Sequence, residues 1–239
     1  MSANKVALIT GANRGIGLET ARQLAGLGYT VLIGSRKATE GRAAAGSMGG
    51  QAEFVELDME RPETFSALRE VIAQRFGKLD VLVNNAGIGV DIGMKPSTVA
   101  MELVRKTFEV NVFGLVELTQ ILLPLLLKSE GGRIVNLSSI LGSLTMNADL
   151  EAPLGEWRSF GYNGSKAAVN MFTATLAYEL RDTKVKVNSA HPGWVKTELG
   201  GEGAKMEIED GAKTSVRLAT LSADGPSGGY FHLGETLPW

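Results

Sequence analysis

Short apolar runs rich in β-branched residues alternate with amphipathic stretches along the whole chain. Helical periodicity is clearest at 15–28, 62–77 and 165–182. Strand-like runs lie at 5–10, 30–35, 52–58, 79–85, 132–139, 185–191 and 228–233. Continuous apolar strands that alternate with helices are typical of a parallel sheet with both faces covered. The pattern therefore predicts an α/β fold, with a doubly wound parallel sheet of about seven strands and helices on both faces.

No break in composition divides the chain. It has 239 residues and contains no repeat, no low-complexity tract and no Pro- or Ser-rich linker. A chain of this length can bury enough apolar surface for one α/β domain, so we expect a single domain over 1–239. The first strand-like run follows 1–4 directly, without the pattern of a signal peptide, so we expect a cytoplasmic protein.

The most apolar run, 112–128, raises the question of a membrane span. Glu117, Gln120 and Pro124 interrupt this run. A helix packed inside the protein fits such an interrupted run better than a membrane-spanning helix does. We therefore expect no membrane partner.

Charge and composition exclude several function classes. The formal net charge of −2 comes from 24 basic and 26 acidic residues without a basic stripe, which argues against nucleic acid as a partner. The chain has no cysteine, so disulfides, thiolate catalysis and Cys-ligated zinc are excluded. His191 and His232 are far apart in the sequence and belong to no cluster of metal ligands, so we expect no metal site.

The first strand-like run ends in a glycine-rich turn that opens a helix. Gly11 allows a sharp turn, Gly15 lets the backbone approach a ligand, and Gly17 permits close packing of the helix on the strand. The exposed amides at the start of such a helix can bind a phosphate. An ordinary glycine-rich turn is the alternative, but the position of the motif in the first βαβ unit favours dinucleotide binding.

Tyr162 and Lys166 are four residues apart in the first turns of a predicted helix, so their side chains should lie one above the other. A free phenol has a pKa of about 10 and is a poor acid near neutrality. A nearby cation favours the phenolate and should lower the pKa of Tyr162. Taken alone, the pair is better explained as an incidental contact on a solvated helix.

Seven short segments in chain order decide between these interpretations. They are 10–17 (TGANRGIG), 57–59 (LDM), 84–87 (NNAG), 111–114 (NVFG), 136–139 (NLSS), 162–166 (YNGSK) and 191–197 (HPGWVKT). Together they resemble the motifs of the short-chain dehydrogenase/reductase family, in its branch of roughly 250 residues, over essentially the whole chain. The resemblance implies a Rossmann-type fold and a nicotinamide cofactor.

The resemblance also implies which residues hold the cofactor. Asp58 would hold the adenine, and the backbone around Val195 with the hydroxyl of Thr197 would hold the nicotinamide. Thr197 could instead cap a following helix. The implied cofactor contacts are Gly11, Asn13, Arg14, Gly15, Ile16, Gly17, Asp58, Met59, Asn85, Ala86, Gly87, Tyr162, Lys166, Pro192, Gly193, Val195 and Thr197.

Four residues would carry the chemistry that the resemblance implies. Tyr162 would donate a proton to the developing alkoxide, and Ser139, with Ser138 as the weaker candidate, would hydrogen-bond the same oxygen. Lys166 would hold the nicotinamide ribose, and Asn111 would hold a water that resupplies the proton. General acid catalysis of this kind contributes roughly 10²–10⁴-fold in rate. Each residue has a structural alternative: Ser139 could end a strand, and Asn111 could be satisfied by backbone.

The end of the second strand-like run predicts the form of the cofactor. An enzyme for NAD(H) usually has Asp or Glu there, on the ribose hydroxyls. This chain has Ser35, Arg36 and Lys37 instead, and Glu40 lies beyond the strand in the next predicted helix. Arg36 could pair with a 2′-phosphate while Arg14 closes on it from the other side. We therefore predict NADPH/NADP+, with a solvated charge run as the alternative.

The substrate is predicted from the connection between Ser139 and Tyr162 and from the C-terminal segments. The connection 140–161 is longer than in many family members and shorter than in carbonyl reductases of the animal and plant type. Residues 191–201, 210–221 and 224–239 look like those of the carbonyl-reductase subgroup, which implies NADPH-dependent reduction of ketones or aldehydes. Large apolar side chains would suit hydrophobic carbonyls, with ordinary core packing as the alternative. The pocket residues we expect are Ser139, Ile140, Leu141, Trp157, Trp194 and Leu199, with Leu144 and Met206 as further wall candidates.

Other functions and partners stay open at this point. An NAD(P)-dependent alcohol, sugar or steroid dehydrogenase working mainly in the oxidative direction is one alternative, and a cofactor-bound regulator is another. Residues 198–213 could form a mobile lid or a solvated loop. The helices over 104–128 and 165–180 look like those that pair subunits in the family, so we expect a homodimer or homotetramer.

Overall fold

The computed structural model describes residues 5–239 and contains one eight-stranded sheet in the order β3-β2-β1-β4-β5-β6-β7-β8. The strands from β1 to β7 pair in parallel, and β8 pairs antiparallel with β7. The strands are β1 (Val6–Thr10), β2 (Thr30–Ser35), β3 (Ala52–Glu56), β4 (Val81–Asn84), β5 (Arg133–Leu137), β6 (Lys186–Ala190), β7 (Tyr230–His232) and β8 (Glu235–Thr236). The predicted doubly wound sheet is confirmed, and the two-residue β8 adds one strand to the seven expected.

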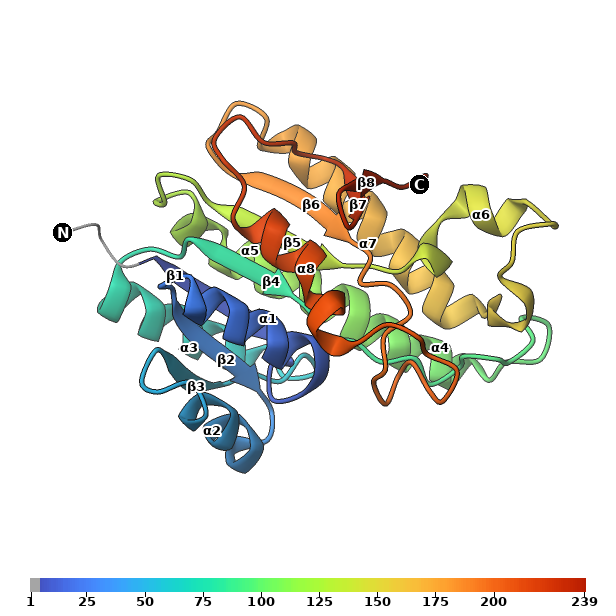
Figure 1. Cartoon of the computed structure of the whole chain (residues 1–239), viewed down its shortest axis with the longest axis horizontal. Helices are drawn as coiled ribbons and strands as arrows, with labels where there is room; N and C mark the ends of the chain where they lie inside the picture. The colour runs from blue at the N-terminus through green and yellow to red at the C-terminus, as the bar shows by residue number, and fades with distance from the viewer. Residues whose placement is uncertain (1–4) are drawn as a thin grey trace.

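Helices cover both faces of this sheet (Figure 1). The two apolar cores account for this, because β1 sends Leu8 into one and Ile9 into the other. The first core packs against α3, α5 and α7, and the second against α1, α2 and α8. The helices are α1 (Gly15–Gly26), α2 (Ala38–Gly46), α3 (Glu63–Phe76), α4 (Met101–Phe108), α5 (Gly114–Leu126), α6 (Leu144–Ala148), α7 (Phe160–Glu179) and α8 (Ile208–Ala219). Three short segments have other helical forms: the π-helix η1 (Glu109–Phe113) and the 3₁₀ turns η2 (Ile140–Gly142) and η3 (Gly155–Trp157).

The long helical stretch Met101–Leu126 is apolar enough, by length and composition, to span a membrane. Just over half of its most apolar window, 56%, is buried inside the protein. Leu115, Leu118 and Leu122 belong to the first core and are almost fully buried. A core helix passes the same composition test, and this burial agrees with the packed helix expected from the sequence.

Helix α7 begins at Phe160, so that Tyr162 lies in its first turn, as the sequence predicts. The buried carboxylate of Asp91, from the loop after β4, accepts the backbone N–H groups of Gly161 at 2.6 Å and Tyr162 at 2.9 Å. These are two of the amides that a helix start leaves without partners. The loop after β4 therefore fixes where α7 starts.

A buried chain of polar side chains ties α7 to the sheet. Asn84 of β4 donates to Oδ1 of Asn136 on β5 at 2.8 Å, and Asn136 donates to the hydroxyl of Thr173 at 2.9 Å. Buried amides of this kind are stable only when paired. The network fixes α7 against the ends of β4 and β5. The strand order changes direction between β1 and the neighbouring β4, and ligands of such sheets bind at the carboxyl ends of the strands at this change of direction.

Candidate active site

The glycine loop after β1 has backbone angles that few other residues adopt. Gly11 has a φ of +64°, and Gly15 has a φ of +57°. A Cβ on Gly17 would lie 2.4 Å from Nδ2 of Asn85, so a larger residue there would displace that amide. The hydroxyl of Thr10 accepts the backbone N–H groups of Asn85 and Ala86 at 2.9 and 2.8 Å. The loop is therefore held against the end of β4.

The start of α1 fits an anion. Arg14 occupies the N-cap without a side-chain cap hydrogen bond, and the first turn contains no acidic residue. The first amides of a helix point outward and carry a partial positive charge. A phosphate can bind them without competing with a carboxylate.

A cavity of about 770 Å³ lies over this loop and the carboxyl ends of the neighbouring strands. Most of the predicted cofactor residues line it: Gly11, Asn13, Arg14, Gly15, Ile16, Gly17, Ser35, Arg36, Lys37, Asp58, Met59, Asn85, Ala86, Gly87 and Thr197. Other lining residues were not predicted. The motifs used above contain Leu57, Leu137 and Lys196 and are flanked by Glu60, Ile88, Val110 and Glu198, whereas Ile208 lies further along the chain. For all but Ile208, the position in or beside a motif was the available signal.

The cation cluster after β2 has carboxylate neighbours. Arg36 lies 3.7 Å from Glu60, and Lys37 lies 2.7 Å from Glu40. Asn13 of the glycine loop donates to Glu40 as well, at 2.7 Å. The hydrogen bond from Lys37 is the main cause that lowers the pKa of Glu40. Glu40 lies in the first turn of α2, as expected. Its place in the cavity wall was not expected.

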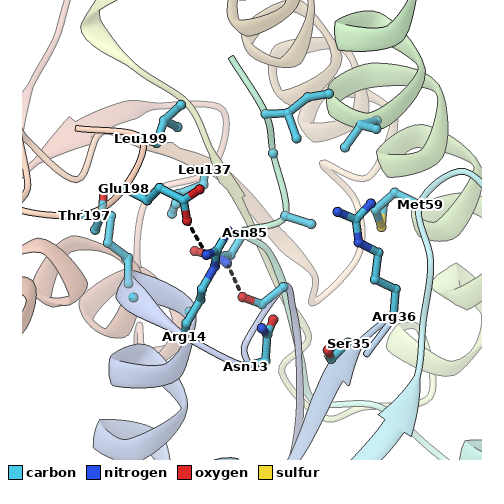
Figure 2. A pocket seen from close by; sticks show the side chains of 18 of the residues that line it. Asn13, Arg14, Ser35, Arg36, Met59, Asn85, Leu137, Thr197, Glu198 and Leu199 are labelled. Atoms are coloured by element: carbon cyan, nitrogen blue, oxygen red, sulfur yellow. Dashed lines mark hydrogen bonds and ion pairs between the residues drawn. The ribbon is translucent and has the colours of Figure 1, made fainter. Parts of the chain in front are cut away.

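Arg14 pairs with Glu198, and both residues line the same cavity. Figure 2 shows Arg14 turned toward Glu198 and Arg36 turned toward Met59. The sequence predicts that both arginines contact one phosphate. In this structure their side chains point to different places. Both members of the Arg14–Glu198 pair are largely exposed, so the contact is weak. A ligand with a stronger charge can displace it.

Tyr162 and Lys166 lie in contact, as their spacing predicts. The Lys166 ammonium is 5.7 Å from the centre of the Tyr162 ring and donates to the carbonyl oxygen of Leu137 at 2.8 Å. Burial raises the pKa of Tyr162 to about 12, against the opposing hydrogen bond with Ser139. Burial also lowers the pKa of Lys166 to about 8. The predicted lowering of the phenol pKa is therefore not found, because loss of hydration disfavours the phenolate more than the neighbours favour it.

Asn111 lies in the π-helix η1 and is bonded to the loop after β4. Its amide donates to the Ile88 carbonyl at 2.8 Å and to the Ser165 hydroxyl at 3.0 Å, while Oδ1 accepts the Ile88 N–H at 2.8 Å. This is the backbone-satisfied arrangement left open above. A Cβ on Gly87 would lie 3.3 Å from Oδ1 of Asn111 and 3.4 Å from Nζ of Lys166. Both groups thus border one spot beside Gly87.

A second cavity, of about 250 Å³, adjoins the first, since Ile16, Thr197 and Leu199 line both. The rings of Trp157 and Trp194 meet edge to face in its wall, with centres 5.7 Å apart. All six predicted substrate residues line it: Ser139, Ile140, Leu141, Trp157, Trp194 and Leu199. The cavity also brings in Tyr162, Pro192, Gly193 and Val195 from the other predictions.

Two predictions in this region do not hold, and one structural alternative is excluded. Leu144 is 68% exposed and lies outside both cavity walls, because it begins α6 on the surface. Met206 pairs through its backbone with the Trp194–Lys196 segment and also lies outside both walls. Thr197 caps no helix, because its hydroxyl accepts the N–H of Gly200 in a turn and α8 begins only at Ile208.

The chain that forms these cavities is similar to known proteins. A family model described as short chain dehydrogenase matches residues 5–208. Salutaridine reductase of Papaver bracteatum is 33% identical over 97% of this chain and 95% of its own length. Carbonyl reductase (NADPH) 1 of Mus musculus is 32% identical over 100% of this chain and 99% of its own. The crystal structure of NADPH-bound carbonyl reductase from chicken fatty liver superposes with a TM-score of 0.87 at 26% identity, covering 99% of this chain and 94% of that one.

Proposed function

The chain belongs to the short-chain dehydrogenase family, and from that premise we propose that it reduces ketones or aldehydes with NADPH, with Tyr162 as the proton donor. At the coarser level it is an oxidoreductase of the carbonyl-reductase type that depends on NADP. One observation carries the proposal: an apolar cavity lined by Ser139 and Tyr162 adjoins the cavity above the glycine loop. A carbonyl in the smaller cavity would lie beside a cofactor in the larger one. The cytoplasmic location stays a prediction.

The residues present fit the cofactor. The uncapped start of α1 suits the pyrophosphate, and Arg36 and Lys37 suit a 2′-phosphate. NADPH, when bound, supplies the hydride, a chemistry that no protein side chain provides. Arg14 would join the phosphate contacts after exchanging Glu198 for the cofactor.

The protein's own part in the reaction is to position the carbonyl and supply a proton. With a pKa of about 12, Tyr162 keeps its proton at neutral pH and can give it to the substrate oxygen. The Ser139 hydroxyl, which hydrogen-bonds the phenol, would hold the same oxygen. The Lys166 ammonium lies over the ring and would stabilise the phenolate left behind. Asn111, which borders the same spot as Lys166, would place a water that returns the proton.

The test is NADPH consumption with a panel of aldehydes, diketones, aryl ketones and sugars. We expect turnover with apolar carbonyls, and a kcat/KM for NADPH above that for NADH. Faster alcohol oxidation with NADP+ than ketone reduction under matched conditions would favour the oxidative alternative.

The variant Tyr162→Phe tests the assigned proton donor. The change keeps the ring and removes the hydroxyl, so kcat should fall roughly 10²–10⁴-fold while the affinity for NADPH is kept. Both are measured on the same preparation, by turnover and by titration with NADPH. Near wild-type turnover would remove Tyr162 from the mechanism.

A further inference from the structure

His191 is a polar residue in the wall of the substrate cavity that the proposed reduction does not use. The other polar residues there have roles or partners: Ser139 and Tyr162 at the carbonyl, Thr197 on the cofactor side, and Ser138, which donates to the Lys166 carbonyl. The remaining wall is largely apolar. A histidine at this place therefore calls for a chemical explanation.

The hydrogen bonds of His191 define its tautomer. Its Nδ1 is 3.3 Å from the backbone nitrogen of Ile140, the residue directly after Ser139. A backbone N–H can only donate, so Nδ1 must accept and carry no proton. The proton of the neutral ring is then on Nε2. The ring thus supports the backbone beside Ser139 with one nitrogen and offers a donor with the other.

His232 lies against His191. Its Nδ1 donates to the backbone carbonyl of His191 at 3.0 Å, and the two ring centres are 4.9 Å apart. Burial, with the nearby His232, lowers the pKa of His191 to about 3. The ring is therefore neutral across the physiological range. Its Nε2 has no hydrogen-bond partner among the described residues.

We propose that His191 determines substrate specificity: its Nε2–H donates a hydrogen bond to a second oxygen of the substrate, near the carbonyl that is reduced. The favoured class is then a vicinal diketone or 2-oxo ester with an apolar body. An oxygen acceptor would gain a bond here that the apolar wall residues, such as Leu141, Leu154 and Trp157, cannot give. The inference rests on the proposed function.

Two variants separate the two nitrogens. In His191→Asn, the side-chain oxygen can take the place of Nδ1 and still accept from Ile140, but no donor reaches the position of Nε2. In His191→Gln, the longer side chain brings an amide N–H to the position of Nε2, but it has no acceptor at the position of Nδ1 for the N–H of Ile140. The substrate contact and the backbone support therefore change independently.

The ligands are 1-phenyl-1,2-propanedione and propiophenone, which share a skeleton and differ by the second carbonyl. Binding to the NADP+-loaded enzyme is followed by tryptophan fluorescence, since Trp157 and Trp194 lie in the cavity wall, with correction for ligand absorbance. Reduction of both ketones with NADPH is measured in parallel. Binding needs no turnover, so a protein that binds the ketones without reducing them would contradict the proposed function and leave this test intact.

For His191→Asn we expect the affinity for the diketone to fall about three- to tenfold more than the affinity for propiophenone, as for loss of one neutral hydrogen bond. His191→Gln should keep most of the difference between the two ligands. Equal losses for both ketones in His191→Asn, or no loss for either, would overturn the proposal, because the histidine would then serve the backbone alone.

Discussion

At the scale of single residues, the acid–base state of the site depends on burial. Tyr162 and Lys166 are both shielded from water, and burial moves their two pKa values apart, to about 12 for Tyr162 and about 8 for Lys166. The phenol stays neutral, which suits a proton donor, and the ammonium of Lys166 titrates at about 8. The spacing in the sequence identified the pair, but it carried no information on how deeply the helix buries it.

The pKa of Lys166 sets a pH limit for the free enzyme. Its pKa is lowered from the ordinary value of 10.5 to about 8, so the ammonium is present below pH 8 and is lost above it. Because the ammonium supports both the ribose contact and the phenolate, kcat/KM for NADPH should fall as the pH rises through 8. That parameter reports the free enzyme. A profile that stays flat up to pH 10 would contradict the role of the ammonium.

At the scale of elements, the segment between β6 and α8 lines the cofactor cavity. Its Glu198 holds Arg14, and its Leu199 lines both cavities. The sequence analysis left this segment as a lid or a loop. An ion pair between positions 184 residues apart leaves no local pattern, so the sequence could not place Arg14 against Glu198.

The variant Glu198→Gln tests whether this contact competes with the cofactor. The change releases Arg14, so the affinity for NADPH should rise by up to about fivefold, as for an exposed ion pair of at most about 1 kcal/mol. NADH, which lacks the 2′-phosphate, should gain less. Both affinities are measured by titration.

The matched control for Glu198 is Glu202→Gln. Glu202 lines the same cavity and has the same charge, but it forms no ion pair among the described residues. An equal gain in NADPH affinity from both variants would assign the effect to net charge and would contradict a contact through Arg14.

Helix α7 shows which part of an element can be read from sequence. Its apolar period and the Tyr162–Lys166 spacing predicted the helix and the stacked pair correctly. Tyr162 was placed correctly in the first turns of this helix, but the cap was not predictable, because it comes from Asp91, about seventy positions away. Local capping signals predict a helix start only when the cap is a neighbour in the chain. The glycine loop was easier to identify, because its geometry depends on consecutive residues.

The variant Asp91→Asn measures the value of this remote cap. An amide nitrogen cannot accept, so one of the N–H groups of Gly161 and Tyr162 would lose its partner. An unpaired buried donor costs about 1–3 kcal/mol, and we expect a loss of unfolding free energy of that size in urea denaturation. The control is Asp149→Asn at an exposed turn, where Oδ1 accepts the N–H of Glu151. Equal stability of the two variants would show that the cap contributes little.

At the scale of the molecule, one sheet carries both apolar cores, which supports the predicted single domain. The order of elements was predictable because strands and helices differ in the periodicity of their apolar residues. Contacts made by the fold were not predictable in this way. His191 and His232 are far apart in the sequence, but their ring centres lie 4.9 Å apart because β6 and β7 end side by side.

The helical layer of α4, α5 and α7 supports the prediction of an assembly. Phe113, Met171 and Tyr178 are 56%, 63% and 70% exposed although they are large and apolar. A stable interface buries about 1,200–2,000 Å² in total and has an apolar centre. These side chains lie on η1 and α7, over the stretches expected to pair subunits. We therefore predict a homodimer or homotetramer formed through this layer.

Light scattering on the eluting protein tests the assembly at micromolar concentration. The double variant Met171→Glu and Tyr178→Glu should dissociate it, because a charge buried without a partner opposes association. The control is Leu27→Glu, which alters a residue of similar exposure at the end of α1, in the layer on the other face of the sheet. That variant should keep the mass of the unmodified protein. A monomeric mass for the unmodified protein would contradict the prediction, and an assembly that both variants leave intact would place the interface on another surface.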